Sequence, residues 1–535
     1  MPNTPQYIFV TGGVVSGIGK GITVASLGTL LNARGLTLGI IKLDPYLNVD
    51  AGTMNPFQHG EVFVTDDGAE TDLDLGHYER FTDLSLTQDS NTTTGRIYRN
   101  VFDAERKGDY LGKTVQLIPH ITDEIKKAIT KVGKGKDIVI AEIGGTVGDI
   151  EAEVFIEAIR QFRRDVGAQN VCYIHVTKID YIYPSDEPKT KPTQQAVALL
   201  RTRGIQPNIL VVRSKNGFTK EMRSKIALFC DVDVDDVIPA PNAQSLYNIP
   251  LNLEKVGLSK RVCKHLYIPN NKPHLVAWNA LSRQIAGSTH TVTIGMVGKY
   301  IDNPDAYISV FEALYHAGIA NKAHVTITPI DSEEITPANV AKKLNGMDGI
   351  VVPGGFGLRG IEGKITAISY ARTKKIPFLG LCLGLQCAVI DFARNVCGLK
   401  DAHSTEFDAQ TPDPVIDILP EQKKIRAKGG TMRLGSYPTV CAKNSLVHLL
   451  YGKEKIEERH RHRYEVNPDY HTILKDKGLI LSGMSPNGTL VEFIELPKKV
   501  HPFFIATQAH PEFKSRPTRP APLFDGLVRV ALGKL

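Results

Sequence analysis

Short apolar runs rich in β-branched residues alternate with helical stretches along the first half of the chain, and this alternation constrains the fold more than any other feature. The runs are apolar at nearly every position, which is typical of parallel strands covered on both faces. Residues 22–32 are apolar nearly all round, as expected for a helix packed on such a sheet. The pattern predicts a parallel α/β sheet with strands at residues 7–10, 38–42, 137–142, 171–176 and 208–212.

A second series of strands and helices follows, so the sequence predicts two α/β domains. Between Tyr267 and Thr289 the character changes, with Pro-Asn-Asn-Lys-Pro at 269–273 and Gly-Ser-Thr at 287–289, which are typical of a connecting segment. We expect a first domain at 1–268, a linker at 269–290 and a second domain at 291–535. Strands of the second domain are expected near 292–297, 325–328, 349–352, 377–381, 479–482, 490–496 and 503–508. The Pro-, Asp- and Lys-rich stretch 401–430 is expected to be a surface excursion.

Composition excludes several classes of protein. A chain of 535 residues is long enough for about two to four domains, and 42% hydrophobic with 23% charged residues is near the globular average. The 64 Lys and Arg exceed the 57 Asp and Glu by a net charge of +7. This excess is too small to indicate a nucleic-acid partner, although small anionic ligands remain possible.

The cysteines and the apolar runs favour a cytoplasmic protein. The seven cysteines form no Cys-x-x-Cys pair, which argues against a disulfide or zinc framework and for a reducing compartment. The chain does not open on a basic region followed by an apolar stretch, and its apolar runs fall short of the roughly 18 residues that a membrane helix needs. We expect neither export nor membrane insertion.

A glycine-rich loop follows the first expected strand and leads directly into a helix. In the string Gly12-Gly-Val-Val-Ser-Gly-Ile-Gly-Lys-Gly21, glycines let backbone amides surround phosphate oxygens, and Lys20 is placed to reach terminal phosphates. The usual pattern has a glycine where Val14 stands and Ser or Thr where Gly21 stands. The string predicts a variant phosphate loop, and the alternative is a glycine-rich turn with a surface lysine.

Because no hydroxyl follows Lys20, a magnesium ion bound with a nucleotide needs other oxygen ligands. Glu142 ends an apolar strand at the edge where parallel strands face a ligand crevice, and its burial without a partner would be costly. Asp74 is the second candidate, with a solvated acidic face as its alternative. Candidate anion-binding residues are Lys42 after the second strand and the pair Lys189 and Lys191 on a Pro-containing loop. A solvated lysine pair is the alternative for the last two.

The second domain contains a candidate nucleophile. An apolar strand runs into Gly380-Leu-Cys-Leu-Gly384 and then into a helix expected to begin near Leu385, which is the pattern of a nucleophile elbow. A free thiol with a pKa of about 8.5 is mostly protonated at pH 7, so Cys382 needs a histidine nearby. His510 is the candidate. If its segment is extended, Glu512 lies on the same face and orients the imidazole.

The neighbouring motifs complete this interpretation. Adjacent glycines at Gly354 and Gly355 are placed to direct a backbone amide at an oxyanion. The other six cysteines are interpreted as packing residues. His460 and His462 alternate with arginines, which disfavours a bound cation, so we expect surface positions or contact with an anion.

Together these motifs resemble the CTP synthase family, the glutamine-dependent amidoligases of pyrimidine nucleotide synthesis, over essentially the whole chain. The strings that carry the resemblance are 7–21, 42–46, 52–54, 58–64, 68–81, 142–151, 189–194, the Cys382 elbow, 404–407 and 510–512. The resemblance implies a P-loop-like parallel α/β synthetase domain followed by a class I glutamine amidotransferase α/β domain.

In the first domain the resemblance implies that ATP phosphorylates the 4-oxygen of UTP and that ammonia then displaces phosphate to give CTP. Lys20 and Lys42 would stabilise the transferring phosphate, and Asp74 with Glu142 would hold Mg²⁺. Residues matching the ATP site are Gly17, Ile18, Gly19, Lys20, Gly21, Ile22 and Asp74; Pro241, Asn242 and Ala243 occupy the place of its adenine-contacting turn with residue identities that differ from the family pattern. Residues matching the UTP and CTP sites are Ser16, Asp149, Ile150, Glu151, Lys189, Thr190, Lys191, Pro192, Thr193, Gln194 and Lys225.

In the second domain the resemblance implies that Cys382 attacks the glutamine amide, with His510 as base and Glu512 orienting it. Residues matching the glutamine site are Gly355, Leu383, Gly384, Leu385, Gln386, Glu406 and Arg463. The family is activated by GTP, inhibited by CTP and assembled as homotetramers, and His59 matches a residue near its ammonia channel.

Two other functions stay open at this point. One is a nonenzymatic ATP-dependent switch fused to an inactive amidotransferase fold, which the presence of Cys382, His510 and Glu512 disfavours. The other is a glutamine-dependent amidase of a carboxylate substrate, built from similar halves. The string at 189–194 favours UTP over that substrate.

Overall fold

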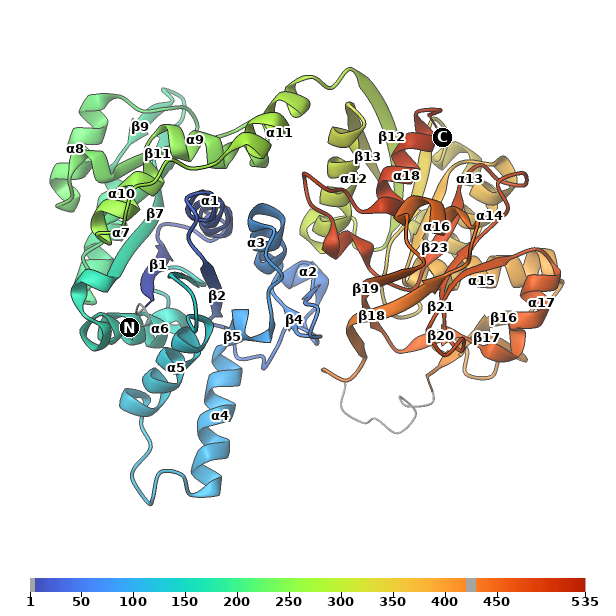
Figure 1. The fold of residues 1–535 in the computed structure, drawn as a ribbon, viewed down its shortest axis with the longest axis horizontal. Helices are drawn as coiled ribbons and strands as arrows, with labels where there is room; N and C mark the ends of the chain where they lie inside the picture. The colour runs from blue at the N-terminus through green and yellow to red at the C-terminus, as the bar shows by residue number, and fades with distance from the viewer. Residues whose placement is uncertain (1–4, 420–429, 535) are drawn as a thin grey trace. The chain divides into compact units, whose positions relative to one another are not determined.

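The computed structural model describes residues 5–419 and 430–534 and divides the chain into two compact units (Figure 1). The first unit comprises residues 1–51 and 74–282, and the second comprises 52–73 and 283–535. The second unit therefore includes a segment of 22 residues, 52–73, that interrupts the first unit in sequence. We call it the inserted segment. The division between the units falls within α11 (Val276–Ala286).

The first unit is built on a seven-stranded sheet in the order β11-β10-β7-β1-β6-β2-β5, and its strand pairs are parallel. All five predicted strands are confirmed. The sequence pattern missed two edge strands because one is short and polar and the other contains two prolines. The strands are β1 (Gln6–Gly12), β2 (Leu38–Asp44), β5 (Asn91–Thr93), β6 (Ile138–Ile143), β7 (Val171–Lys178), β10 (Ile209–Ser214) and β11 (Val237–Pro241).

Helices cover this sheet as the crossover pattern predicts. The predicted all-apolar helix is α1 (Lys20–Asn32), which is buried along nearly its whole length. In contrast, α6 (Glu153–Val166) buries one apolar face, and its Phe162 packs edge-on against Tyr7 and Phe9 of β1. The other helices are α3 (Asp74–Thr82), α4 (Thr94–Lys107), α5 (Thr122–Val132), α7 (Lys191–Thr202), α8 (Lys220–Cys230), α9 (Ile249–Lys255) and α10 (Leu258–His265).

The interpretation of residues 189–194 as a loop is wrong for most of that string. Lys189 ends the hairpin strand β9 (Glu187–Lys189), which pairs with β8 (Asp180–Ile182), and Lys191 is already the first residue of α7. Pro192 stands in the first helical turn, where the missing N–H costs nothing and the fixed φ suits the helix.

The second unit is built on a nine-stranded sheet in the order β13-β12-β14-β15-β23-β22-β21-β18-β19. Its pairs are parallel from β13 to β23 and antiparallel from there to β19. The predicted strands are confirmed within β12 (His290–Gly298), β13 (Ala323–Asp331), β14 (Gly349–Val352), β15 (Phe378–Leu381), β21 (Ile480–Met484), β22 (Val491–Glu495) and β23 (Phe504–Thr507). The strands β18 (Arg433–Cys441) and β19 (Lys455–His462) were not predicted, because their polar residues hide the alternation.

Smaller elements complete the second unit. Its helices are α2 (Pro56–His59), α12 (Ile308–Ala320), α13 (Val340–Lys343), α14 (Ile361–Lys374), α15 (Leu383–Phe392), α16 (Leu446–Tyr451), α17 (His471–Asp476) and α18 (Pro522–Ala531). The short strands β3 (Phe63–Val64) and β4 (Glu70–Thr71) form a hairpin. The expected surface excursion at 401–430 is wrong over its first part. There β16 (Ala402–Ser404) and β17 (Asp413–Ile418) join β20 (Tyr464–Val466) in a sheet that buries Val415 and Ile416. Residues 420–429 lie outside the described residues.

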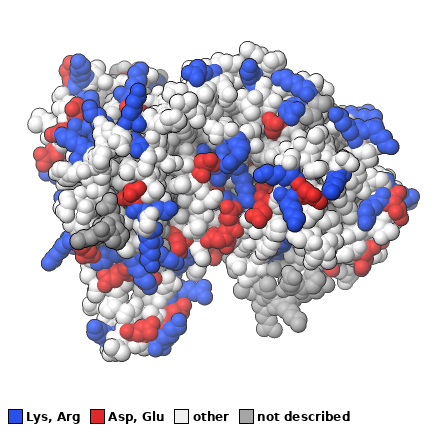
Figure 2. Space-filling view, in the orientation of Figure 1, with Lys and Arg blue, Asp and Glu red and all other residues white. Residues whose placement is uncertain are grey.

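The distribution of charge on the surface agrees with the small net charge of the sequence. On the face shown in Figure 2, Lys and Arg side chains are interspersed with Asp and Glu rather than gathered into one basic face. Among the described residues no helix combines the length and the apolar character that a membrane span needs.

The strand β19 corrects the interpretation of His460 and His462. Both side chains are fully buried rather than on the surface, and His460 Nδ1 lies 3.0 Å from His462 Nε2. Burial and the nearby Arg433 lower both pKa values well below the usual range, so both rings are neutral. Residues two apart in a strand share a face, and the alternate residues Arg459 and Arg461 face the inserted segment.

The inserted segment is attached to its unit by those two arginines. Arg459 Nε donates to Asp66 at 2.7 Å and its Nη1 donates to the carbonyl of Val64 at 3.0 Å. Arg461 Nε donates to Glu70 at 2.8 Å. Burial raises the pKa of Asp66, but Arg459 outweighs it and lowers that pKa below its ordinary value.

Replacement of Arg459 by Met tests this attachment. The side chain is 1% exposed, and its loss leaves the Val64 carbonyl and Asp66 without a guanidinium donor. We expect the free energy of unfolding of the second unit to fall by about 2 kcal/mol, measured by urea denaturation. The control Arg160→Met removes an exposed ion pair with Glu157 and should change stability by less than about 0.5 kcal/mol. Equal effects of the two substitutions would contradict the proposed attachment.

Candidate functional site

Cys382 stands between β15 and α15 with φ +51° and ψ −101°. A non-glycine residue in this region is strained, and strain at a strand-to-helix turn is the signature of a nucleophile elbow. The flanking glycines are required by space. A Cβ at Gly380 would lie 2.8 Å from the backbone of Gly384, and one at Gly384 would lie 2.2 Å from the Val352 carbonyl oxygen. The helix begins at Leu383, two residues earlier than predicted.

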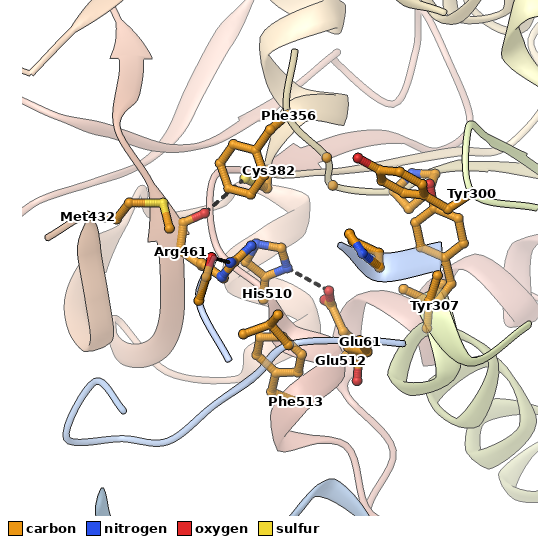
Figure 3. A pocket seen from close by; sticks show the side chains of 18 of the residues that line it. Glu61, Tyr300, Tyr307, Phe356, Cys382, Met432, Arg461, His510, Glu512 and Phe513 are labelled. Carbon is orange, nitrogen blue, oxygen red and sulfur yellow. Dashed lines mark hydrogen bonds and ion pairs between the residues drawn. The ribbon is translucent and has the colours of Figure 1, made fainter. Parts of the chain in front are cut away.

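His510 and Glu512 form the expected pair through a different backbone. The extended segment is wrong, because residues 511–514 form a 3₁₀ turn that opens on Pro511. This turn still brings Glu512 Oε1 to 2.7 Å from His510 Nδ1 (Figure 3). Burial lowers the pKa of His510, but Glu512 and Cys382 outweigh it and raise the pKa to about 10. The imidazole is therefore held in its protonated form beside the thiol.

These three residues share a cavity of about 480 Å³ whose lining belongs entirely to the second unit (Figure 3). Of the predicted glutamine-site residues, Gly355, Glu406 and Arg463 line it. Glu406 accepts from the Gly357 N–H at 2.8 Å, and burial raises its pKa. The remaining predicted residues are buried in the elbow helix and do not line the cavity, namely Leu383, Gly384, Leu385 and Gln386. The cavity thus offers a thiol, a carboxylate and a guanidinium.

Two residues of this site were missed from the sequence. Lys299 is buried, and its Nζ donates to the carbonyls of Phe356 and Gly357, which fixes the glycine loop beside Cys382. Its position directly after β12, at the carboxyl edge of the sheet, was an available signal. Gln508 donates to Cys382 Sγ at 3.6 Å, and a buried glutamine two residues before His510 gives no comparable signal.

The phosphate loop lies between β1 and α1 in the first unit. Its surroundings explain why Gly21 stands where the usual phosphate-loop pattern has Ser or Thr. A Cβ at Gly21 would lie 2.0 Å from Asp74 Oδ1, so the carboxylate of Asp74 fills the space beside the residue that follows Lys20. A Ser or Thr side chain has no room at this position. Lys20 begins α1 and donates to the carbonyl of Gly145 at 2.5 Å, and burial lowers its pKa.

Three carboxylates surround Lys42 close to this loop. Its Nζ is paired with Asp74 and lies 3.6 Å from Asp44 and 3.5 Å from Glu142. Tyr78 donates to Glu142, and burial raises the pKa of Glu142 to about 7. The sequence analysis missed Asp44, although it stands two residues after Lys42 on one strand and therefore shares its face.

The cluster fits a magnesium ion held jointly with phosphate groups. Among the residues that the structure describes, no group of three or more His, Cys, Asp or Glu side chains forms a ready-made metal cage. Mg²⁺ is usually bound by one or two carboxylates together with nucleotide phosphates and water. Burial is the largest cause of the raised pKa of Glu142, and a bound cation would stabilise the charged form of this carboxylate.

A second cavity, of about 590 Å³, adjoins the phosphate loop. It brings together several predicted ATP-site residues, namely Gly19, Ile22, Pro241, Asn242 and Ala243. None of the residues predicted for UTP and CTP lines it. Ser16 and Lys225 are exposed, residues 149–151 form an exposed turn before α6, and Lys189 pairs with Glu187 at 2.5 Å. His59, at the end of α2, lies 3.3 Å from Asp72 within the second unit.

Comparison with known proteins matches both units. Residues 6–268 match the family described as CTP synthase N-terminus, and residues 303–530 match glutamine amidotransferase class-I. A CTP synthase of Methanocaldococcus jannaschii is 58% identical over 535 residues, covering 99% of each chain. A CTP synthase of Bacillus subtilis is 56% identical over 525 residues, covering 98% of each chain. Among solved structures, the glutaminase domain of Trypanosoma brucei CTPS with bound acivicin is 39% identical, covers 46% of this chain and 95% of its own, and has a TM-score of 0.43.

Glu512→Gln tests the electrostatic origin of the His510 shift. The raised pKa of His510 means that its pairing stabilises the folded protein fully below pH 6.5 and that this contribution is lost as pH rises through about 10. The variant should therefore be less stable than the unaltered protein by about 3 kcal/mol at pH 6, with a much smaller difference at pH 10, by urea denaturation. A difference that does not shrink with rising pH would show that Glu512 acts through packing alone.

Proposed function

The chain belongs to the CTP synthase family, and on that premise we propose how its residues divide the reaction. It is a glutamine-dependent ligase that aminates UTP to CTP. One observation carries the assignment of its nitrogen-donor half: Cys382 at a strained elbow shares a cavity with the hydrogen-bonded pair His510 and Glu512. Full-length relatives named CTP synthase favour UTP amination over the carboxylate amidase and over the nonenzymatic switch.

In the second unit, Cys382 Sγ attacks the carboxamide carbon of glutamine. His510 holds the proton that the thiol gives up and delivers it to the departing ammonia, while Glu512 keeps the imidazole oriented. Water then attacks the thioester, releasing glutamate and restoring the thiol. The backbone amide of Gly355 stabilises the oxyanion, and the amide at the start of α15, at Leu383, is the second proposed donor; Gly384, Leu385 and Gln386 support it from within the buried helix. Glu406 and Arg463 bind the charged ends of glutamine.

In the first unit, the γ-phosphate of ATP passes to the uracil 4-oxygen of UTP. Ammonia attacks the activated carbon, and phosphate leaves with the former oxygen. Lys20 and Lys42 stabilise the charge on the transferring phosphate. Asp74 and Glu142 would hold Mg²⁺, which when bound would neutralise phosphate charge. The phosphate loop binds the ATP phosphates, with residues 17–22 in contact, and Pro241 to Ala243 bind the adenine in the adjoining cavity.

The remaining ligand sites rest on matching motifs. The residues proposed for UTP are Ser16 and 189–194, and those for the inhibitor CTP are 149–151 and Lys225. GTP activates the glutamine-hydrolysing half, and His59 matches a family residue near the ammonia channel. The working form is a cytoplasmic homotetramer without a nucleic-acid or membrane partner. Its synthetase domain is residues 1–268, joined through 269–290 to the amidotransferase domain at 291–535.

Cys382→Ala separates the two nitrogen sources. CTP formation from glutamine should fall by at least about 1,000-fold, because the nucleophile is lost, and formation from free ammonia should stay near that of the unaltered enzyme. Both rates follow from the absorbance change on conversion of UTP. The matched control Cys441→Ala removes a buried thiol of the same unit and should keep both activities. Loss of both activities in a folded Cys382→Ala protein would contradict two separate sites.

Glu142→Gln tests the synthetase half, where we expect the variant to lose CTP formation but to keep glutamine hydrolysis. The substitution keeps the shape of the side chain and removes its charge, so CTP formation from either nitrogen source should fall by about 100-fold or more. Glutamine hydrolysis, measured as glutamate release, should persist because Cys382 and His510 lie in the other unit. Normal turnover with ammonia would remove Glu142 from the proposed magnesium site.

A further inference from the structure

His175 lies buried beneath the phosphate loop, and the reaction described above does not use it. It stands on β7, where its side chain is 0% exposed. Its Nδ1 lies 2.8 Å from Thr11 Oγ1. Burial, aided by Lys20, lowers the pKa of His175 to about 3, so the ring is neutral. Its Nε2 has no hydrogen-bond partner among the described residues, which is unusual for a buried nitrogen and calls for an explanation.

The ring forms the floor of the phosphate loop at Gly13. A Cβ at Gly13 would lie 2.8 Å from His175 Nε2 and 2.6 Å from Ala196 Cβ. Both distances are shorter than any contact a Cβ makes, so the loop backbone rests directly on the imidazole and on α7. The Gly13 N–H donates to the Val176 carbonyl at 3.0 Å, which ties the loop to the same strand. The backbone at Gly13 is thus held in place by contact with His175 and Ala196 and by the hydrogen bond to Val176.

The next residue carries backbone strain. Val14 has a φ of +83° and is the only β-branched residue among the described non-glycine residues with positive φ. It stands where the usual loop has a glycine, the residue that adopts this conformation without cost. A β-branched residue is held in this region only where its surroundings fix the backbone. The fixed position of Gly13 on His175 supplies that constraint.

We propose that His175 is a positioning residue that holds the Gly13–Val14 turn in the strained conformation required for binding ATP phosphates. Through Thr11 it is fixed to β1 on one side, and through direct contact with Gly13 it prevents the loop from relaxing into the sheet. The inference rests on the proposed function of the loop as the ATP site. The proposal implies that His175 and Val14 are energetically coupled. The His175 side chain is needed only while residue 14 is one, such as valine, for which a positive φ is strained.

A double-mutant cycle tests this coupling with ATP as the probe and ammonia as the nitrogen source. His175→Ala should raise the KM for ATP roughly tenfold or more with a smaller change in kcat, because the loop relaxes before ATP binds. Val14→Gly alone gives the reference KM of the cycle, against which the double variant is compared. The double variant should recover most of the loss, since glycine adopts the left-handed backbone without the support of His175. A simple structural role of His175 would not produce this rescue.

Two further variants control for folding and for the loss of a buried hydrogen bond. Thr11→Val keeps the shape and removes the bond to His175, and it should raise the KM for ATP in the same direction, with rescue by Val14→Gly. Tyr173→Phe removes a buried bond to the Ile159 carbonyl from the same strand and should leave the KM for ATP unchanged. Glutamate release from glutamine should be normal in all variants.

The outcomes separate this inference from the function on which it rests. If the unaltered enzyme makes no CTP from UTP, ATP and ammonia, the proposed function fails. If it does, and both His175→Ala and Thr11→Val keep its KM for ATP, the positioning role is wrong. It is also wrong if the KM rises but Val14→Gly gives no rescue, because His175 would then act independently of the strained turn.

Discussion

The synthetase unit depends on one constraint, the burial of charge around Lys42. Asp74, Asp44 and Glu142 surround its ammonium group, and the buried charges of Lys42, Asp44 and Glu142 need partners. Asp74 can reach Lys42 only because residue 21 is glycine, so the missing hydroxyl of the phosphate loop follows from the cluster. Burial in the same cluster raises the pKa of Glu142, and the proposed magnesium ion would stabilise its charged form.

The two units share one structural device, a strained turn between a strand and a helix. Each places its reactive group where a strand turns into a helix, with a non-glycine residue at positive φ in the turn: Val14 after β1 and Cys382 after β15. In both turns a neighbouring glycine is packed so closely that no side chain fits. The difference lies in what the strain serves. At Cys382 it directs a thiol into the cavity, and at Val14, in the proposed function, it shapes a backbone loop for phosphate.

The parallel strands and the local motifs could be predicted well from the sequence, because each depends on the residue types within a short segment. The sequence predicted Cys382, His510 and Glu512 as one group, and the structure places them in one cavity. Prediction from the sequence was wrong where contacts between distant segments determine whether a residue is buried. His460 and His462 were expected at the surface because their arginine neighbours are polar, yet Arg459 is buried and both Arg459 and Arg461 are paired with carboxylates of the inserted segment. No local sequence pattern places that segment in the second unit. Asp44 was missed although the spacing from Lys42 was sufficient to find it.

In the proposed function, one chain joins a glutamine-hydrolysing site to a separate site that activates UTP. The most direct test follows the conversion of UTP by the unaltered enzyme with ATP and magnesium, comparing glutamine with free ammonia. The predicted result is CTP from both nitrogen sources, with GTP accelerating only the reaction that uses glutamine. Glutamine hydrolysis without any conversion of UTP, from either source, would contradict it.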